Sequence, residues 1–332
     1  MERKLASIRK VENIIPIEGA DMIEVSVVGG WKVVTKKGEF KPGDLAIYCE
    51  VDSFLPIKEE FEFLRKSSYK KMGEQEGFRL KTIRLRGQLS QGLLLPASQE
   101  VLSLYKEGED VTGLLGIVKY EPPIPAELAG KVKGMFPSFL RKTDEERIQN
   151  LTENYNEWKE KVFYVTEKLD GSSATFYLKD GEFGVCSRNL ELLETEGNTF
   201  WKVARELDLE NKLRETGRNI SIQGELVGEG IQGNPYKIKG QTVYFFNAFD
   251  IDVQQYYSQK EMEDFIQSLN LKTVPILDRN YTLPETVEDL LQYADSKSEL
   301  NKDFGREGVV VRSLDRSISF KVISNNFLLK EK

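Results

Sequence analysis

The sequence predicts an α+β chain in which an all-β domain is followed by a mixed domain. The 332 residues are enough for two domains of ordinary size. Short β-branched or alternating runs, separated by turn signals, fill residues 1–119. From residue 162 to residue 332, strand patterns alternate with amphipathic helix patterns. This second pattern indicates a separate α+β domain with antiparallel sheets.

Composition narrows the class of protein. Hydrophobic residues make up 39% of the chain, so a packed core is available, and the apolar runs are too short to cross a membrane. The N-terminus, MERKLASIRK, lacks the apolar stretch of a signal peptide. Two distant cysteines, Cys49 and Cys186, are expected to be reduced, which favours a cytoplasmic location. Because the chain has no histidine, histidine bases, Ser-His-Asp triads and histidine metal sites are excluded.

The first part of the chain has about five runs with strand patterns. They are IEVSVV (23–28), WKVVTK (31–36), LAIYCEV (45–51), FRLKTIRL (78–85) and GLLLP (92–96). VGG, KKGEFKPGD and RGQ supply the turns between them. So many short strands predict a small barrel over 1–119, either OB-like (oligonucleotide-binding) or SH3-like, between which strand counting does not decide.

Residues 120–161 are expected to join the two domains. EPPIPAEL (121–128) is a proline-rich linker, and TDEERIQNLTENYNEWKEK (143–161) has a helix pattern. Thr143 is a candidate N-cap, and apolar residues recur at helical spacing from Ile148 to Trp158. The sequence therefore predicts a linker followed by one helix.

The second domain begins with paired strands. FYVTEKL (163–169) precedes SATFYLKDGEFGVCSR (173–188), where Asp180-Gly181 is a hairpin turn. Residues 198–217 form an amphipathic helix pattern with Asn198 as N-cap, and 258–271 form another with Ser258 and Glu261 in capping-box spacing. Further strands are expected over 219–228, 242–251, 307–314 and 317–324, the last two as a hairpin.

One stretch, TEKLDGSS (166–173), places Lys168 beside Asp170 and Gly171 between two strand patterns. In isolation this pattern favours a surface ion pair. Other motifs follow in order: SRN (187–189), QGELVGEGIQGNPY (223–236), FFNAFDI (245–251), EGVVVR (307–312) and SFKVIS (319–324). As a set, they resemble the covalent nucleotidyltransferase superfamily of ATP-dependent polynucleotide ligases and capping enzymes, and QGELVGEGIQGNPY resembles the RNA ligase branch.

The position of the barrel narrows the resemblance. Ligases of DNA and capping enzymes carry an OB domain after the last motif, whereas here the barrel comes first and the chain ends eleven residues after Lys321. This order resembles the RNA ligase family of the Deinococcus and Naegleria enzymes. It implies an N-terminal OB-like nucleic-acid-binding domain (1–119), a linker and helix (120–161) and a nucleotidyltransferase domain (162–332).

The resemblance also implies an activity. Such an enzyme seals a 3′-OH to a 5′-phosphate, at nicks in duplexes with RNA on the 3′-OH side, through lysyl-AMP and an adenylylated 5′ end. The implied cofactors are ATP and Mg²⁺ or Mn²⁺, and the partner is RNA or an RNA-containing nicked duplex. We expect a monomer. Two alternatives stay open: a GTP-dependent capping-type nucleotidyltransferase, and a non-catalytic RNA-binding module.

By the same resemblance, Lys168 is the nucleophile. A free lysine, with a pKa of roughly 10.4, is protonated at neutral pH, so desolvation and a nearby cation are needed to make it reactive. The family's metal-site acids, which often act through bound waters, correspond to Asp170, Glu225 and Glu307, hard oxygen ligands that suit Mg²⁺. The nucleotide-binding residues correspond to Glu167, Arg188, Glu225, Phe249, Val310 and Lys321.

Within that set, Arg188 is expected at the ribose, Lys321 at a phosphate, and Phe249 and Val310 on the two faces of the adenine. Phe245 and Phe246 compete with Phe249 for the stacking position. The chain departs from the family in one place, because many relatives have a second lysine where this sequence has Ile323.

Binding of nucleic acid is predicted for the barrel, although the net charge is −7. FRLKTIRLR contains Arg79, Lys81, Arg84 and Arg86, which suit a phosphodiester backbone. The first two and the last two have opposite strand parity. A bulge or turn near Thr82-Ile83 is therefore required to place all four on one face.

Overall fold

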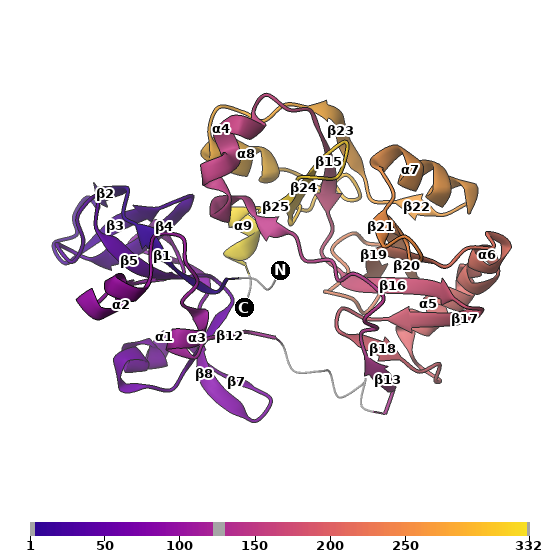
Figure 1. Ribbon diagram of the computed structural model, residues 1–332, viewed down its shortest axis with the longest axis horizontal. Coiled ribbons are helices and arrows are strands. Elements are labelled where there is room, and N and C mark those ends of the chain that lie inside the picture. The colour runs from indigo at the N-terminus through magenta and orange to yellow at the C-terminus, as the bar shows by residue number, and fades with distance from the viewer. Residues whose placement is uncertain (1–3, 122–129, 331–332) are drawn as a thin grey trace. The chain divides into compact units, whose positions relative to one another are not determined.

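The computed structural model describes residues 4–121 and 130–330, and contacts divide them into two units (Figure 1). Residues up to 121, with 148–155 and 328–330, form the first unit, and 130–147 with 156–327 form the second. The predicted proline-rich linker falls almost wholly outside the described residues.

The first unit is built from short strands in several small sheets, with short helices between them. The sheet orders are β1-β5-β11, β2-β3-β4, β12-β6-β8-β7 and β10-β9. The strands are β1 (Ala6–Lys10), β2 (Asn13–Pro16), β3 (Ile23–Val28), β4 (Trp31–Lys36), β5 (Leu45–Cys49), β6 (Ser53–Pro56), β7 (Tyr69–Met72), β8 (Gln75–Arg79), β9 (Thr82–Leu85), β10 (Gln88–Gln91), β11 (Leu93–Pro96) and β12 (Val118–Lys119). The helices are η1 (Glu59–Leu64), α1 (Arg65–Ser68), α2 (Gln99–Leu104) and α3 (Thr112–Leu115).

Strand β5 lies at the centre of this unit because both of its faces are covered. Ile47 and Cys49 belong to one apolar cluster, while Ala46 and Tyr48 belong to another that includes Trp31. A continuous apolar run such as LAIYC suits a strand that is buried on both sides.

The predicted strand over 78–85 is two strands. β8 ends at Arg79, in the four-stranded sheet, and β9 begins at Thr82, in a separate hairpin with β10. The strands are separated by Leu80 and Lys81, whereas Thr82 and Ile83, where a bulge or turn was expected, belong to β9. The β9–β10 hairpin closes through Arg86 and Gly87, which both have positive φ. The chain therefore changes sheet within FRLKTIRL.

The single helix predicted for 143–161 is wrong. The segment contains β14 (Glu146–Arg147), two 3-10 turns, η3 (Ile148–Asn150) and η4 (Thr152–Asn154), and the short helix α4 (Tyr155–Trp158). Thr143 lies before these elements, outside any helix. The backbone is diverted to other partners: β14 pairs in parallel with β25, and the Gln149 carbonyl oxygen accepts from the Gly30 amide. Tertiary hydrogen bonds thus override the helical spacing.

The second unit contains two sheets and the longer helices. The eight-stranded sheet has the order β13-β18-β17-β16-β19-β20-β21, with β22 also paired to β20, and the five-stranded sheet has the order β14-β25-β24-β15-β23. The remaining strands are β13 (Val132–Met135), β15 (Phe163–Lys168), β16 (Ser172–Lys179), β17 (Glu182–Cys186), β18 (Leu190–Leu192), β19 (Ile220–Gly228), β20 (Gln241–Asp250), β21 (Gln255–Tyr256), β22 (Lys272–Thr273), β23 (Ile276–Tyr281), β24 (Gly308–Ser313) and β25 (Ser319–Ile323). The helices are α5 (Thr199–Glu206), α6 (Leu209–Glu215), α7 (Gln259–Ser268), α8 (Val287–Ala294) and α9 (Asn325–Leu328).

Helices α5, α6 and α7 pack against the eight-stranded sheet (Figure 1). The main apolar cluster joins Trp201, Leu213 and Ile266 of these helices to Phe176 and Phe245 of the strands. The helix-covered face therefore carries the main core, and the other face of β16, β19 and β20 carries polar side chains beside smaller apolar clusters.

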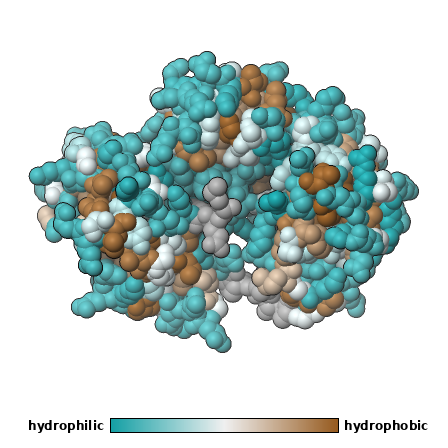
Figure 2. Space-filling model, viewed as in Figure 1, coloured by the Kyte–Doolittle hydropathy of each residue, from teal (hydrophilic) through white to brown (hydrophobic). Residues whose placement is uncertain are grey.

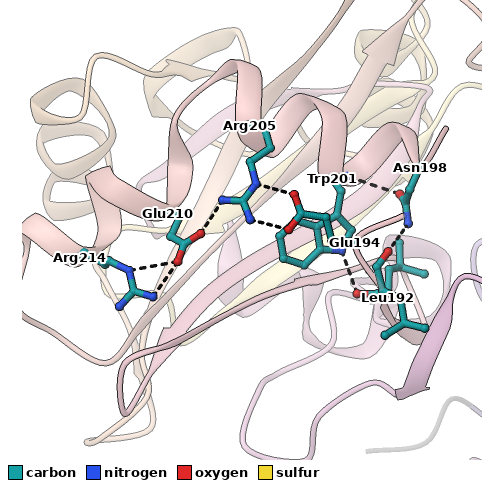
Figure 3. A network of polar contacts seen from close by, with 8 residues as sticks. Leu192, Glu194, Asn198, Trp201, Arg205, Glu210 and Arg214 are labelled. Carbon is teal, nitrogen blue, oxygen red and sulfur yellow. Dashed lines mark hydrogen bonds and ion pairs between the residues drawn. The ribbon is translucent and has the colours of Figure 1, made fainter. Parts of the chain in front are cut away.

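The predicted caps of α5 and α7 are confirmed, but the helix predicted for 198–217 is broken. The Asn198 side chain accepts from two amides of the first turn, and Ser258 and Glu261 form the capping box. The break falls at Asp208, whose φ of 53° is left-handed. Arg205 spans the break by pairing with Glu210 of α6 as well as with Glu194 (Figure 3). The ion pair between Arg205 and Glu210 thus links α5 to α6 across the break in the helix.

The visible surface of each unit is mostly hydrophilic, with hydrophobic residues in small separate patches (Figure 2). Of the helices within 4–121 and 130–330, none is long and apolar enough to cross a bilayer.

Gly308 offers a test of the strand packing in the second unit. A Cβ at this position would lie 2.1 Å from the Val322 carbonyl oxygen, so Gly308→Ala must push β24 and β25 apart. We expect the variant to lose about 2–3 kcal/mol of unfolding free energy, measured by urea titration. Gly305→Ala is the matched control, because its nearest neighbour would be 3.9 Å away. Equal stabilities of the two variants would contradict the packing argument.

Candidate active site

Strand pairing brings a lysine and a glutamate together at one end of the five-stranded sheet. Lys168 is the last residue of β15 and pairs with Gly308, the first residue of β24. Glu307 immediately precedes Gly308, and its Oε1 lies 2.6 Å from the Lys168 Nζ. The ion pair therefore joins residues that are 139 positions apart in sequence.

Two further carboxylates act on the same lysine. Asp170 follows in the turn between β15 and β16, and Glu225 of β19 pairs with Ser173 of β16. The turn comes close to β19 because residue 171 is glycine: a Cβ there would lie 2.4 Å from the Leu226 carbonyl oxygen. Both acids interact electrostatically with Lys168. The sequence-predicted nucleophile and its three predicted acids are thus brought to one place.

The charges at this place are unequal. Burial lowers the pKa of the Lys168 ammonium, but the negative charges of Glu307 and Glu225 outweigh burial, so the pKa lies above its ordinary value. Burial raises the pKa of Glu225 to about 8; Lys168 opposes this rise, whereas Glu307 and Asp170 add to it. One ammonium therefore faces three carboxyl groups, and the site is short of positive charge.

The donor set fits a hard divalent cation. Carboxylate oxygens are the ligands that Mg²⁺ and Mn²⁺ prefer, and the three carboxyl groups have only one ammonium among them. Among residues 4–121 and 130–330, no three acidic or cysteine side chains converge closely enough to hold a metal directly. The arrangement suits an ion that keeps part of its water shell.

Two other predicted residues meet at an aspartate. Arg188 follows β17 of the eight-stranded sheet, and Lys321 lies on β25 of the five-stranded sheet. Asp144 accepts from both: its Oδ2 is 3.3 Å from the Arg188 Nη2, and its Oδ1 is 3.1 Å from the Lys321 Nζ. No sequence signal singled out Asp144, which lies in an irregular segment where a helix was expected.

Register places Val310 and Lys321 on the face of the sheet that carries Lys168. Val310 pairs with Thr166 on one side and Lys321 on the other, and Thr166 is two residues from Lys168. Ile323 shares this face but is 4% exposed and pairs with Gly308. The position where relatives often have a second lysine is thus an apolar, buried one.

The three candidate aromatic residues have different environments. Phe249 is 1% exposed and packs with Leu140, Tyr177 and Tyr256, and Phe245 is buried in the core beneath the helices. Phe246 is half-buried and packs with the cluster around Leu169, the neighbour of Lys168. Of the three, only Phe246 has a partly exposed side chain, and it packs with the cluster that contains Leu169.

Glu167 alternates to the opposite face of β15 from Lys168. Its Oε2 accepts from the Glu299 amide at 2.8 Å, and its buried Oε1 has no partner among the described residues. Burial raises the pKa of this carboxyl group.

Comparisons with known proteins agree with this geometry. A family described as RNA ligase matches residues 161–326, and an OB-fold domain family matches residues 5–97. A solved structure of a glutamate-to-alanine mutant of the Naegleria gruberi RNA ligase with AMP and Mn is 47% identical, with a TM-score of 0.92 and 98% of each chain covered. No curated protein sequence matches significantly.

The chain belongs to the RNA ligase family. Two further Naegleria gruberi structures, a glutamate-to-alanine mutant with ATP and Mn and the RNA ligase with PPi, are each 48% identical, cover 98% of both chains and have TM-scores of 0.91. The protein is an RNA ligase enzyme, with an N-terminal OB-fold domain and a C-terminal RNA ligase domain.

This RNA ligase has a further site residue that sequence reasoning did not single out. The Tyr236 hydroxyl accepts the backbone N–H of Asp170 at 2.6 Å, and the Pro235 carbonyl oxygen accepts from Asn301. Tyr236 ends the motif QGELVGEGIQGNPY, in which Gln232 also donates to the Gly171 carbonyl oxygen. The motif therefore braces the turn that carries Asp170, a role that its spacing from Lys168 could not reveal.

The four basic residues predicted to bind nucleic acid do not share a face in the RNA ligase. Arg79 is 14% exposed, pairs with Asp52 at 3.0 Å and lies over the Tyr120 ring. Arg84 and Arg86 are exposed on the β9–β10 hairpin, and Lys81 lies at its base. Arg84 also donates to the Gly87 carbonyl oxygen. The hairpin therefore presents two of the four residues to solvent.

The pKa of Glu225 generates a prediction about stability. With a native pKa of about 8 against an ordinary 4.5, the native state keeps a proton that the unfolded chain releases. The stability that this bound proton contributes is complete at a pH below 4.5, the ordinary pKa. It is lost as the pH rises through about 8, the pKa in the native state. Glu225→Gln, which does not titrate, should therefore gain stability relative to wild type as pH rises from about 5 to about 9.

The measurement is the melting temperature of metal-free protein at both pH values. Glu229→Gln, at an exposed glutamate four residues along the chain, is the control and should show no such gain. A stability difference between Glu225→Gln and wild type that is independent of pH would contradict the assignment.

Proposed function

We propose that this RNA ligase uses ATP to join a 3′-OH to a 5′-phosphate in three steps. The Lys168 Nζ attacks the α-phosphorus of ATP, forming lysyl-AMP and releasing pyrophosphate. AMP then passes to the oxygen of a 5′-phosphate end, which frees the lysine. The 3′-OH finally attacks that 5′-phosphate and releases AMP. The observation that carries the proposal is Lys168 at 2.6 Å from Glu307, with Asp170 and Glu225 acting on the same ammonium.

The acids have a role in the reactivity of Lys168. Asp170, Glu225 and Glu307 would hold Mg²⁺ or Mn²⁺, in part through waters, and the ion would neutralise charge on the transferring phosphate. The carboxylates that now hold the lysine as an ammonium are the same ones that bind the cation, so binding of the ion frees the Nζ from its ion pair. The relatives' structures that contain Mn with ATP or AMP support a divalent cation that binds together with the nucleotide.

The nucleotide is held by residues from both sheets of the second unit. Arg188 contacts the ribose and Lys321 a phosphate, while Val310 covers one face of the adenine. The resemblance assigns the exocyclic amine to Glu167, but its side chain lies on the other face of β15 and is 1% exposed. For the other face of the adenine, the half-buried Phe246 is better placed than the closely packed Phe249. Stacking of this kind contributes about 1–3 kcal/mol per base.

A covalent-labelling experiment tests this reaction. With α-labelled ATP and Mg²⁺ or Mn²⁺, the full chain should gain one AMP, and Lys168→Ala should abolish the label, because the nucleophile is removed. Chelation of the metal should have the same effect. Lys260→Ala, at an exposed lysine on α7, controls for loss of a positive charge. Label that persists in Lys168→Ala would sink the proposal.

The same experiment separates the alternatives. A capping-type nucleotidyltransferase would take label from GTP, and a non-catalytic RNA-binding module would take none. The OB-fold domain before the RNA ligase domain favours a ligase over a capping enzyme.

For the substrate, we propose nicks in duplexes with RNA on the 3′-OH side, gripped by the OB-fold domain. Support comes from the β9–β10 hairpin, where Arg84 and Arg86 are exposed next to the partly exposed side chains of Ile83 and Leu85. Basic side chains on such a hairpin contact phosphates without reading the sequence.

Removal of the hairpin charges should separate sealing from the covalent step. In Arg84→Ala with Arg86→Ala, we expect normal lysyl-AMP formation but weaker nick sealing and duplex binding. The slope of log affinity against log salt should fall by about 2, since each lost phosphate contact removes about 0.9. The control is Lys58→Ala with Lys106→Ala, at two exposed lysines elsewhere in the first unit. If sealing and the salt slope match those of the control, the hairpin does not bind the duplex.

A further inference from the structure

Asp144 joins two cations that come from different sheets. Arg188 follows β17 of the eight-stranded sheet, and Lys321 lies on β25 of the five-stranded sheet. The Asp144 Oδ2 accepts from the Arg188 Nη2 at 3.3 Å, and the Asp144 Oδ1 accepts from the Lys321 Nζ at 3.1 Å. The carboxylate therefore offers two anionic oxygens to two converging cations, as a phosphate group does.

The position of this contact matters for the nucleotide. Lys321 pairs with Val310, which pairs with Thr166, so Lys321 shares its face with Lys168. In the function proposed above, Lys321 holds a nucleotide phosphate. Asp144 therefore bonds to the group that a nucleotide phosphate must reach.

Exposure indicates which partner can leave. The Lys321 side chain is 13% exposed, whereas Asp144 is 34% exposed and Arg188 54%. A shielded lysine without an anion is costly, so it is paired in the absence of nucleotide. Asp144 lies nearer to solvent, in a stretch without regular structure, and can be hydrated when it is displaced.

The neighbours of Asp144 are anchored independently. Glu145 pairs with the buried Arg312 at 2.8 Å, and Glu146 and Arg147 form β14 against β25. The position of the segment thus depends on residues 145–147, and loss of the Asp144 side chain would leave that anchor intact.

We propose that Asp144 is an internal substitute for a nucleotide phosphate. It holds Arg188 and Lys321 in place before ATP binds, and the phosphate then takes its place on Lys321. Asp144 is thus a positioning residue that lowers the affinity of the site for ATP and pyrophosphate. This inference rests on the proposed role of Lys321 in nucleotide binding.

The test uses the full chain with Asp144→Asn and Asp144→Ala. We measure the ATP concentration for half-maximal lysyl-AMP formation and, separately, the calorimetric affinity for inorganic pyrophosphate. Both variants should need severalfold less ATP and bind pyrophosphate severalfold more tightly, because Lys321 has lost its competing anion. Asp264→Asn, at an exposed acid paired with Lys260 on α7, controls for the change in net charge.

If Asp144 only held Arg188 and Lys321 in place and did not compete with a phosphate, its removal would weaken the binding of ATP and pyrophosphate. If both variants need more ATP and bind pyrophosphate more weakly, or if neither quantity changes, the inference is overturned. Adding Lys321→Ala to Asp144→Ala should abolish the gain in pyrophosphate affinity, and a gain that survives would also overturn it. If wild type binds pyrophosphate but forms no lysyl-AMP, the proposed function fails, while the pyrophosphate measurements still decide the role of Asp144.

Discussion

The second unit is organised around one half-buried ammonium among three carboxyl groups. The Lys168 Nζ is 2.6 Å from Glu307, and Glu225 and Asp170 act on the same charge. Burial raises the pKa of Glu225 to about 8, and the negative charges of Glu307 and Asp170 add to the rise. In the proposed reaction, a cation bound to these carboxylates would offset that negative charge and free the Lys168 Nζ from its ion pair.

Close backbone approach makes this concentration of charge possible. Gly308 lets β24 lie between β15 and β25, and Gly171 lets the turn after Lys168 reach β19. A side chain at either position would collide with a neighbouring carbonyl oxygen. The glycines beside Asp170 and Glu307 thus allow the close approach that brings the acids to the lysine.

Local signals predicted local structure well, and they predicted the site through its motifs. The caps at Asn198 and Ser258 begin helices as expected because each is satisfied within one turn. The helix predicted for residues 143–161 is wrong because their helical spacing competes with a strand pairing to β25 and a hydrogen bond to Gly30. Both partners are remote in sequence, so no local pattern could reveal them. The motifs located Lys168 and its acids, but Asp144 and Tyr236 act through contacts that only the fold creates.

The bond from Asp170 to Tyr236 has a consequence for how such a sequence can vary. It joins positions 66 residues apart, and the tyrosine is 4% exposed, so the hydroxyl has little freedom to move. A substitution that shortens this side chain would leave the Asp170 amide unsatisfied and let the turn relax away from Lys168. The two segments are therefore one structural unit: a graft of the KLDG turn into another protein would need the NPY loop to come with it.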